Sequence, residues 1–365
     1  MQEFKIGSNE AGQRLDKFLH KYLKEAGSGF LHKMLRKKNI TLNKKKADGK
    51  EMLTAGDVVQ FFFSDETFQK FRGEVRNEAN NMEKFQRGNG EKKTIPQSAA
   101  VALKNAKGSF FQYEEAYKKL KGIEIVFENE HVLLLNKPAG VLAQKSEASD
   151  LSVNEWLIGY LLATGKIAKE QLDTFKPSIC NRLDRNTSGL MICGKSLPGS
   201  QQMNFLIKER KLRKFYRTFV KGKIEDSAYI KGYLKKDEKL NKVFLKNTLT
   251  KNDVPKEFVS IETAYQPLSY GKDYTYLEVE LITGKTHQIR AHLSSIGHPL
   301  LGDAKYGNRE WNHSFSDFKI PKWQLLHSYR LEFPKLEGAL SELSEREFVA
   351  KEPKLYEELK KSKEI

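Results

Sequence analysis

The N-terminal part of the chain contains two short apolar stripes at the spacing of amphipathic helices. Their members are Phe18, Leu19 and Tyr22, followed by Leu31, Met34 and Leu35. The stretch Ala26–Gly29 between the stripes has the composition of a turn. Further on, Gly49 and Gly56 precede the mostly apolar run Val58–Phe63, which predicts a short β-element closed by turns. The pattern therefore predicts a small module of two helices and short strands over residues 1–63.

This periodicity disappears over residues 64–121, where polar residues and charges of both signs predominate. Such a composition cannot bury enough apolar surface to order itself. We predict a polar, partly disordered linker with a helix near Glu114–Leu120. Its aromatic residues are expected to dock on a neighbouring domain, with docking on RNA as the alternative; they are Phe110, Phe111, Tyr113 and Tyr117.

From residue 122 onward, strand and helix patterns alternate. Ile123–Phe127 and Val132–Asn136 indicate two strands joined by a turn, and Ser152–Glu155 is a capping box that predicts a helix start. Gly189–Cys193 is a short apolar strand, and further strands alternate inward and outward positions later in the chain. We predict an α+β domain with a mixed sheet over residues 122–340. A charged C-terminal tail is predicted over residues 341–365, and its segment KLYEELKKSK is predicted to be an exposed helix.

The composition narrows the class of partner. The 365 residues include 64 Lys and Arg against 47 Asp and Glu, a net charge of +17, which favours a polyanionic partner such as nucleic acid or an anionic surface. A mean hydropathy of −0.62 and the absence of a long apolar run argue against a membrane-spanning protein. Only two cysteines are present, Cys180 and Cys193, with no CxxC pair, which indicates a cytoplasmic protein with small apolar cysteines and no bound metal.

Positive charge is concentrated in the N-terminal module. Residues 33–50 carry eight Lys or Arg against one acid, Asp48, a pattern that also fits a merely solvated face. The segments GQRLDKFL, LHKMLRKKNITLNKKK and LTAGDVV, spanning roughly residues 10–63, resemble the S4 RNA-binding domain. The resemblance implies a basic helical face that contacts RNA phosphates. The residues expected to make these contacts are Arg14, Arg36, Lys37, Lys38, Lys44 and Lys45.

Three later segments carry candidate chemistry. NRLDRNTSGL places Asp184 between two arginines in a polar turn, where flanking cations favour the ionised acid, although an Asp beside arginines is often only a structural ion pair. KFYRTFVKG places Lys214 and Tyr216 on one face of a basic strand. TGKTHQIR places His287 and Arg290 in the first turns of a helix, where backbone N–H groups and a guanidinium can face an anion. Taken alone, a histidine there more often caps or packs than catalyses.

Together these segments resemble the RluA-type family of RNA pseudouridine synthases. The resemblance runs from about residue 123 to residue 334 and rests on several long motifs: KPAGVLAQ, NRLDRNTSGLMICGKS, KFYRTFVKG, LITGKTHQIRAHLSSIGHPLLGDAKYG and LLHSYRLEFP. It implies that Asp184 is the essential aspartate, Tyr216 the active-site tyrosine and Arg290 the arginine that pairs with the aspartate. Tyr216 is expected to pack on the uracil and is a candidate base for the C5 proton. The sequence departs from the family's usual residues at three positions, which are Asn181 for His, Asn186 for Asp and Lys285 for Arg. Further RNA contacts are expected from Arg182, Arg185, Lys214, Lys285 and His287.

The implied reaction is an isomerisation of uridine to pseudouridine: the N1–C1′ bond breaks, the uracil turns, and C5 bonds to C1′. Nothing is oxidised and no group is transferred from outside, so we expect neither cofactor nor metal. A glycoside hydrolase would need a second positioned carboxylate, which the candidate set does not offer. We expect a basic cleft that takes an extruded nucleotide of large-subunit (23S) ribosomal RNA, with no obligate protein partner. A transfer-RNA substrate, or a non-catalytic RNA-binding factor of ribosome assembly, are the alternatives.

Overall fold

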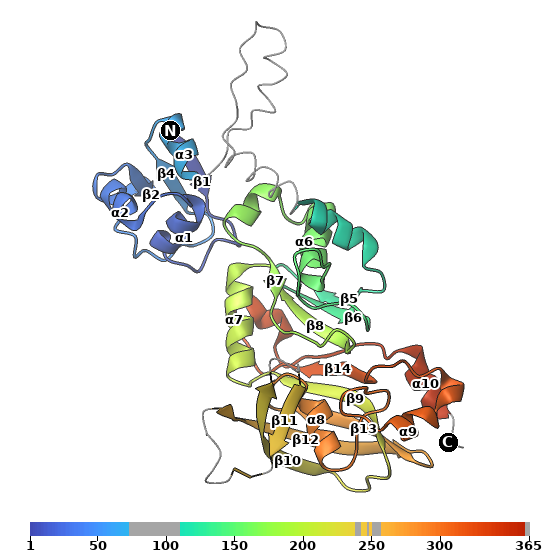
Figure 1. Ribbon diagram of the computed structural model, residues 1–365. Helices are drawn as coiled ribbons and strands as arrows, with labels where there is room; N and C mark the ends of the chain where they lie inside the picture. Colours follow the sequence, from blue (N-terminus) through green and yellow to red (C-terminus); the bar gives the residue numbers. More distant parts are fainter. Residues whose placement is uncertain (73–109, 238–241, 247, 250–256, 362–365) are drawn as a thin grey trace, which may run out of the picture. The chain divides into compact units, whose positions relative to one another are not determined.

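The computed structural model describes residues 1–72, 110–237, 242–246, 248–249 and 257–361 (Figure 1). The chain divides into two compact units. The first contains Met1–Lys119 with Asn154–Ser178 and Gly194–Ser200, and the second contains Leu120–Val153, Ile179–Cys193 and Gln201–Ile365. No helix among the described residues combines the length and apolar character needed to cross a bilayer.

The N-terminal part of the first unit is a small antiparallel sheet with two helices. Its strands, in the order β1-β4-β2-β3, and its helices are β1 Gln2–Lys5, β4 Val58–Phe61, β2 Ile40–Leu42, β3 Lys45–Lys46, α1 Leu15–Tyr22 and α2 Ser28–Arg36. The two helices carry the predicted apolar stripes, which are buried. Phe18 and Tyr22 of α1 stack with ring centroids 5.4 Å apart, and Phe61 of β4 lies 5.6 Å from the Tyr22 ring. The sheet and helices thus share one aromatic core.

The predicted linker over residues 64–121 begins too early, because residues 65–72 form a docked helix, whereas the helix predicted near Glu114–Leu120 is present. Helix α3, Asp65–Arg72, buries Phe68 against the Phe61 ring at 5.4 Å. Residues 110–119 are also helical, and the Tyr117 ring lies 6.0 Å from Trp156 of α6, Val153–Ala163. Each of these short helices packs through only a few apolar side chains. Because charged residues surround them in the sequence, the local composition does not indicate that the helices are packed. Residues 73–109 lie outside the described residues.

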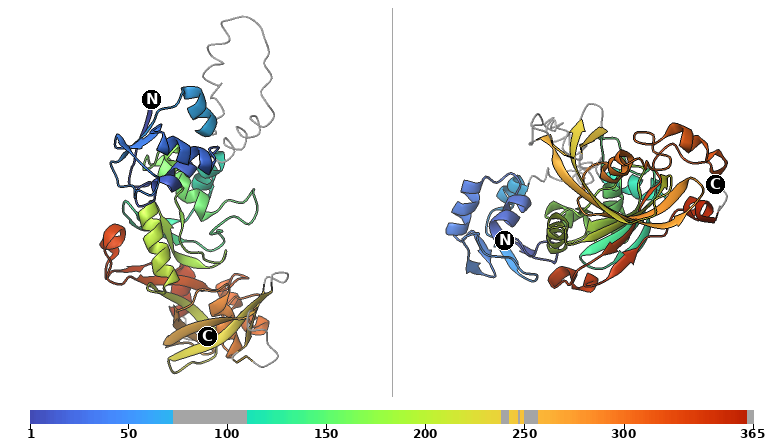
Figure 2. Two further views of the ribbon diagram at one scale, coloured as in Figure 1. Left: turned by 90° about the vertical axis from the view of Figure 1, so that its left-hand side faces the viewer. Right: turned by 90° about the horizontal axis from the view of Figure 1, so that it is seen from below.

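The second unit contains a large mixed sheet, as the sequence predicts. Its principal order is β11-β10-β12-β13-β9-β14-β8-β6-β5, with β15 on β14 and β7 on β8. The strands are β5 Glu124–Glu128, β6 Val132–Lys137, β7 Ser178–Ile179, β8 Ser188–Gly194, β9 Arg213–Lys221, β10 Ala228–Asp237, β11 Lys242–Lys246, β12 Val259–Tyr270, β13 Tyr274–Leu281, β14 Leu326–Glu332 and β15 Glu347–Val349. The β14–β8 pairing is parallel, whereas β9 pairs antiparallel with both β13 and β14. Figure 2 shows the twist of this sheet, which is the usual consequence of strand chirality.

Helices cover this sheet through apolar contacts. Helix α7, Leu197–Lys208, packs Met203 and Leu206 into a cluster with strand residues of β6, β8 and β14. Helix α8, Gln288–Ser295, buries Ala291 among apolar residues of β10, β11 and β12. A short helix, α9 Arg309–His313, contributes Trp311 to a third cluster. These contacts fix α8, which follows β13, against the end of the sheet where the candidate residues lie.

The C-terminal segment is not the exposed tail that its charge suggests. Strand β15 pairs with β14, and helix α10, Lys354–Lys361, buries Tyr356 and Leu359 in the cluster around Phe219. The Tyr274 hydroxyl donates to the Leu359 carbonyl at 2.9 Å. The helix predicted in this tail is present as α10, but the expectation that it is exposed is wrong, because one apolar face within a lysine- and glutamate-rich sequence is enough to dock the helix.

Candidate active site

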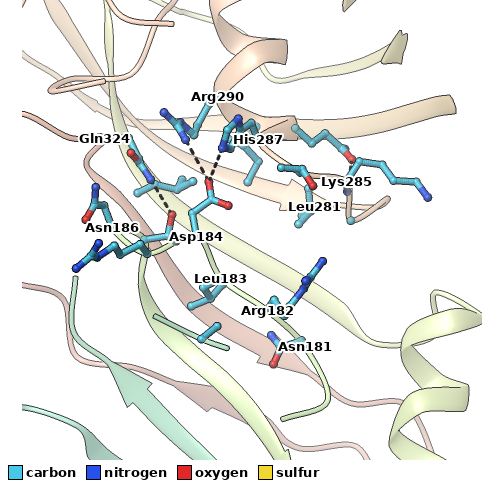
Figure 3. A pocket seen from close by; sticks show the side chains of 18 of the residues that line it. Asn181, Arg182, Leu183, Asp184, Asn186, Leu281, Lys285, His287, Arg290 and Gln324 are labelled. Carbon is cyan, nitrogen blue, oxygen red and sulfur yellow. Dashed lines mark hydrogen bonds and ion pairs between the residues drawn. The ribbon is translucent and has the colours of Figure 1, made fainter. Parts of the chain in front are cut away.

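The three chemistry-bearing segments line one pocket of about 710 Å³ in the second unit. Asp184 lies in the loop between β7 and β8, Tyr216 lies on β9, and Arg290 lies in the first turn of α8. Figure 3 shows Asp184, Arg290 and His287 pointing toward one another across this pocket. The three segments, which are far apart in the sequence, therefore meet at one pocket.

The Asp184 loop is held by a turn and by a close backbone approach. The Thr187 N–H donates to the Asp184 carbonyl at 3.0 Å, which closes the turn. Gly189 follows with φ 108°, and a Cβ there would lie 2.2 Å from the Ser328 carbonyl oxygen of β14. Only glycine permits this conformation and this contact, so Gly189 lets β8 pair with β14 directly below the loop.

Arg290 lies between two carboxylates. Its Nη1 donates to Asp184 Oδ2 at 3.2 Å, while Nε and Nη2 donate to the two oxygens of Asp303 at 2.7 and 2.9 Å. Burial opposes the charged guanidinium, but the hydrogen bonds and charge of Asp303, with the charge of Asp184, raise the pKa of Arg290 above its usual value. Burial alone would raise the pKa of Asp303, yet Arg290 lowers it overall. The guanidinium is therefore fixed in place and fully charged.

Asp303 is the site residue that the sequence reasoning missed. It belongs to the GDAKYG part of a quoted motif, but its position in sequence gives no sign of its contact with Arg290. Its side chain is completely buried, and it also accepts the backbone N–H groups of Lys305 and Tyr306 at 2.8 and 3.1 Å. Asp184 is the single carboxylate among the residues that line the pocket, whereas Asp303 lies behind the guanidinium.

His287 precedes α8 and takes an unusual backbone conformation. Its φ of 55° is in the left-handed region, and its ring points into the pocket. Nε2 lies 3.8 Å from Asp184 Oδ2, and Nδ1 lies 3.0 Å from the Tyr306 hydroxyl. Burial lowers the pKa of His287; Asp184 opposes this change, and Arg290 and Lys305 reinforce it. The imidazole is therefore neutral over more of the acidic range than a free histidine.

Tyr216 forms an apolar wall of the pocket. The residue is 5% exposed, and burial raises the pKa of its hydroxyl to about 12, with a smaller opposing effect from a hydrogen bond with Ser328. At neutral pH the phenol is therefore protonated. In this state the ring can pack on a planar ligand, whereas a general base works best with a pKa near the working pH.

The remaining pocket surface is strongly basic, which suits a polyanion. The cations that the sequence predicts and that line the pocket are Arg182, Arg185, Lys214 and Lys285. Three further lysines lie there without having been predicted, namely Lys145, Lys236 and Lys305. A periodic or motif-based argument cannot find them because they come from separate loops and a strand end.

Lys137 supports the pocket from below. It is completely buried at the end of β6, and its Nζ donates to the carbonyls of Pro138, Val141 and Arg185 at 2.9, 2.9 and 3.0 Å. Burial lowers its pKa to about 7, with Asp184 acting in the opposite direction. The sequence places this lysine only within the quoted motif KPAGVLAQ, whereas the structure shows that it joins two loops.

The three departures from the family's usual residues have different surroundings. Asn181 Oδ1 accepts the Ile192 N–H at 2.8 Å, so it holds the loop against β8. Asn186 lines the pocket close to Arg185, and Lys285 is exposed at its rim. All three are labelled in Figure 3, and none comes between Asp184 and Arg290. No group of three or more His, Cys, Asp and Glu side chains placed to hold a metal occurs in the described parts of the chain.

The N-terminal basic residues belong to the other unit. Arg36, Lys37, Lys38, Lys44 and Lys45 are exposed, at the end of α2 and around β2 and β3. Arg14 differs, because its guanidinium is paired with Asp16, with Nη2 2.6 Å from Oδ2. All six predicted phosphate contacts are therefore accessible, and one of them, Arg14, also makes a local ion pair.

The site can now be set beside known proteins. A family model described as RNA pseudouridylate synthase matches residues 131–295, which include Asp184, Tyr216 and Arg290. Over this stretch the chain is similar to RNA pseudouridine synthases. An uncharacterized RNA pseudouridine synthase of Mycoplasma genitalium is 27% identical to this chain over 92% of the chain and 90% of the relative. Ribosomal large subunit pseudouridine synthase C of Vibrio cholerae is 26% identical over 91% and 89%.

Two further similarities agree with these. Ribosomal large subunit pseudouridine synthase D of Zymomonas mobilis is 31% identical over 58% of this chain and 64% of that protein. The solved structure titled human RNA pseudouridylate synthase domain containing 4 matches with a TM-score of 0.52 and 22% identity, covering 68% of this chain and 95% of that one. The latter similarity supports the fold of the synthase domain.

Proposed function

We propose that this protein converts specific uridines of large-subunit ribosomal RNA to pseudouridine, with Asp184 as the catalytic residue. The observation that carries the proposal is the placement of Asp184 as the single carboxylate lining a basic pocket, with its Oδ2 3.2 Å from Arg290. The substrate class follows from relatives named as ribosomal large subunit pseudouridine synthases. A synthase acting on ribosomal RNA would work in the cytoplasm, in agreement with the cysteine content.

The chemistry assigned to Asp184 follows from its surroundings. Cleavage of the N1–C1′ bond develops positive charge on the ribose, and an ionised carboxylate beside C1′ stabilises that charge. Oδ2 faces Arg290, so Oδ1 is the oxygen left to face the ribose. From there Asp184 either attacks C1′ or removes a C2′ proton, and both routes release uracil to turn and bond through C5. Arg290 donates to Oδ2 and orients the acid for either step.

Tyr216 is assigned a packing role. Its buried, protonated phenol forms a wall of the pocket on which an extruded uracil can stack. The proton that leaves C5 after the new bond forms would reach Tyr216 only if the phenol were first ionised. We therefore assign the ring to holding the base during its rotation.

The N-terminal module is assigned to RNA anchoring. It presents the exposed Lys37, Lys38, Lys44 and Lys45 from the end of α2 and from β2 and β3, as an S4-like module would. Such contacts position an RNA through its phosphates and do not read its bases.

The decisive experiment compares Asp184→Asn with wild type on ribosomal RNA. RNA from a strain lacking the gene, and complemented with each form, is mapped for pseudouridine at single-nucleotide resolution. We expect wild type to restore at least one site in large-subunit RNA and Asp184→Asn to restore none while binding RNA with nearly unchanged affinity. Asp317→Asn, an exposed carboxylate outside the pocket, is the matched control.

Each other outcome is informative. If the strain lacking the gene loses a pseudouridine in transfer RNA and not in ribosomal RNA, the substrate is transfer RNA. If it loses no pseudouridine in any RNA, the enzymatic role is rejected. The same assay in excess chelator tests the expectation of metal-free catalysis, because loss of activity would reveal a required metal.

A further inference from the structure

Two hydrogen bonds and one close approach of 3.8 Å lead from the edge strand β11 to Asp184. The backbone N–H of Val243 on β11 donates to the Tyr306 hydroxyl at 2.8 Å. That hydroxyl lies 3.0 Å from His287 Nδ1, and His287 Nε2 lies 3.8 Å from Asp184 Oδ2. The dashed lines in Figure 3 show Arg290 and His287 both directed at Asp184.

The donor and acceptor roles of these groups follow from counting. The Tyr306 oxygen already accepts the Val243 N–H, so its own hydrogen needs an acceptor. Among the described contacts of this hydroxyl, His287 Nδ1 is the acceptor. Burial raises the pKa of Tyr306, so the phenol retains this hydrogen at neutral pH. A ring nitrogen that accepts a hydrogen bond is unprotonated, which leaves the proton of neutral His287 on Nε2.

The backbone of His287 supports a functional reason for this placement. A non-glycine residue at φ 55° costs on the order of 1 kcal/mol and persists only where the surroundings hold it. The conformation places the imidazole at the start of α8, facing the acid that Arg290 also faces. A histidine that merely contacted RNA phosphate would be charged and exposed, whereas this ring is largely buried and its pKa is lowered.

We propose that Tyr306 fixes His287 as the Nε2–H tautomer, and that this N–H and the Arg290 guanidinium together hold Asp184 through Oδ2, making His287 a positioning residue. The activity part of this inference rests on the proposed function, whereas the tautomer does not. Two donors on one oxygen leave Oδ1 directed at the ribose. The proposal requires the 3.8 Å separation to shorten to a hydrogen bond when RNA binds, as catalytic contacts often tighten in the substrate complex.

The tautomer is measured directly by nitrogen-15 NMR of the histidine rings, which distinguishes a protonated from an unprotonated nitrogen. The His287 signals are identified by their loss in His287→Gln. In wild type at neutral pH we expect Nδ1 to be unprotonated and Nε2 protonated. In Tyr306→Phe we expect a mixture of both tautomers. A protonated Nδ1 in wild type, or an unchanged tautomer in Tyr306→Phe, would overturn the inference.

The Tyr306→Phe substitution should also raise the pKa of His287. The charged groups facing this ring are Asp184 and Asp303 on the acidic side and Arg290 and Lys305 on the basic side. A hydrogen bond donated to Nδ1 favours the neutral ring, so its removal in Tyr306→Phe raises the pKa of His287. The NMR titration reports this shift in the absence of RNA, so it decides the matter even if the proposed function fails.

Kinetics provide the second measurement. We expect Tyr306→Phe to lower kcat about 10-fold with KM for RNA unchanged, because it loosens a group that aligns the acid. Tyr229→Phe is the control. It removes the hydroxyl of Tyr229 on β10, which is hydrogen-bonded to Glu262 on β12, and it should retain wild-type kcat. His287→Gln, which restores an N–H donor, should retain more activity than His287→Ala. An increase in KM at constant kcat would instead identify His287 as an RNA contact and reject the positioning role.

Discussion

At the scale of single residues, the site depends on a guanidinium that is fixed before substrate arrives. Arg290 is 6% exposed, and two of its three bonded nitrogens are used by Asp303. Only Nη1 is directed at Asp184. A charge held on one side by a buried partner does not have to reorganise when the reaction develops charge on the other side.

The first prediction tests this anchoring role of Asp303. Asp303→Asn keeps the size of the side chain but removes the charge and one acceptor, so Arg290 shifts away from its present position. We expect kcat to fall about 100-fold with RNA affinity nearly unchanged, since small displacements in an active site are costly. Single-turnover kinetics and RNA titration measure the two quantities separately.

The Asp303→Asn substitution also breaks the buried ion pair between Arg290 and Asp303, so the variant should unfold at a lower temperature. Assays are therefore run well below the unfolding midpoint of the variant. Asp317→Asn serves as control, and wild-type kcat in a folded Asp303→Asn protein would contradict the anchoring role.

A second residue-scale prediction concerns stability and pH. His327 is completely buried, its Nδ1 lies 2.9 Å from the Ser188 hydroxyl, and burial lowers its pKa to about 4. Between that value and the ordinary value of about 6.5, the unfolded chain binds a proton that the folded protein does not. The contribution of His327 to the free energy of unfolding is therefore complete above about pH 6.5. It decreases as the pH falls toward 4, by on the order of 3 kcal/mol in total.

Denaturant unfolding of wild type and His327→Asn across this range measures the effect. The variant is less stable at neutral pH because it loses packing, but its stability should fall less steeply between pH 6.5 and 4. Parallel curves for the two proteins would show that His327 titrates normally in the folded state.

At the scale of elements, the loop carrying Asp184 depends on a neighbouring loop. Lys137 at the end of β6 donates to the Pro138 and Val141 carbonyls of its own loop and to the Arg185 carbonyl beside Asp184. Gly140 and Arg185 exchange two further bonds, from the Gly140 N–H at 2.9 Å and from Arg185 Nε at 3.1 Å. Asp184 therefore lies on a loop whose position is set by another element.

The third prediction follows from this connection. Lys137→Met retains the apolar stem but leaves three partly buried carbonyls without their shared donor, which should destabilise the protein by about 3 kcal/mol. We also expect kcat to fall because the Asp184 loop relaxes. Urea unfolding and single-turnover assays measure the two effects, with Lys121→Met as an exposed control. Unchanged stability would show that the lysine does not support the loops.

The elements and the site were predictable from the sequence to different extents. Periodicity predicted the helices α1 and α2, and long motifs predicted that Asp184, Tyr216 and Arg290 share a site. Asp303 and Lys137 were not found because their partners are remote in sequence and their roles exist only in the folded chain. The docked helices α3 and α10 were misjudged because Phe68 or Tyr356 lies among charged residues. The density of charged residues in a segment is a poor guide to its solvent exposure, because a helix with one apolar face can still pack against the rest of the protein.

At the scale of the whole molecule, positive charge is present in both compact units. The pocket of the second unit is basic, and the N-terminal module exposes its own lysines. If both regions contact RNA phosphates, each contributes to the release of condensed cations, and the salt dependence of binding reflects the phosphates that both regions neutralise.

The last prediction separates the contribution of the N-terminal module from that of the pocket. A variant with Lys37, Lys38, Lys44 and Lys45 replaced by glutamine keeps the aromatic core of the module intact. We expect its RNA affinity to fall and the slope of log affinity against log salt to decrease by about one for each phosphate that is no longer neutralised. Filter binding at a series of salt concentrations measures the slope, and pseudouridine formation at saturating RNA should keep its wild-type rate.

The control must remove the same charge from another place. Replacing Lys118, Lys119, Lys319 and Lys322 by glutamine removes four exposed lysines that lie outside the module and the pocket. A general effect of net charge would reduce affinity equally in both variants, whereas direct phosphate contacts change the slope only in the first. Equal slopes in the two variants would therefore reject RNA anchoring by the N-terminal module and leave recognition to the catalytic unit.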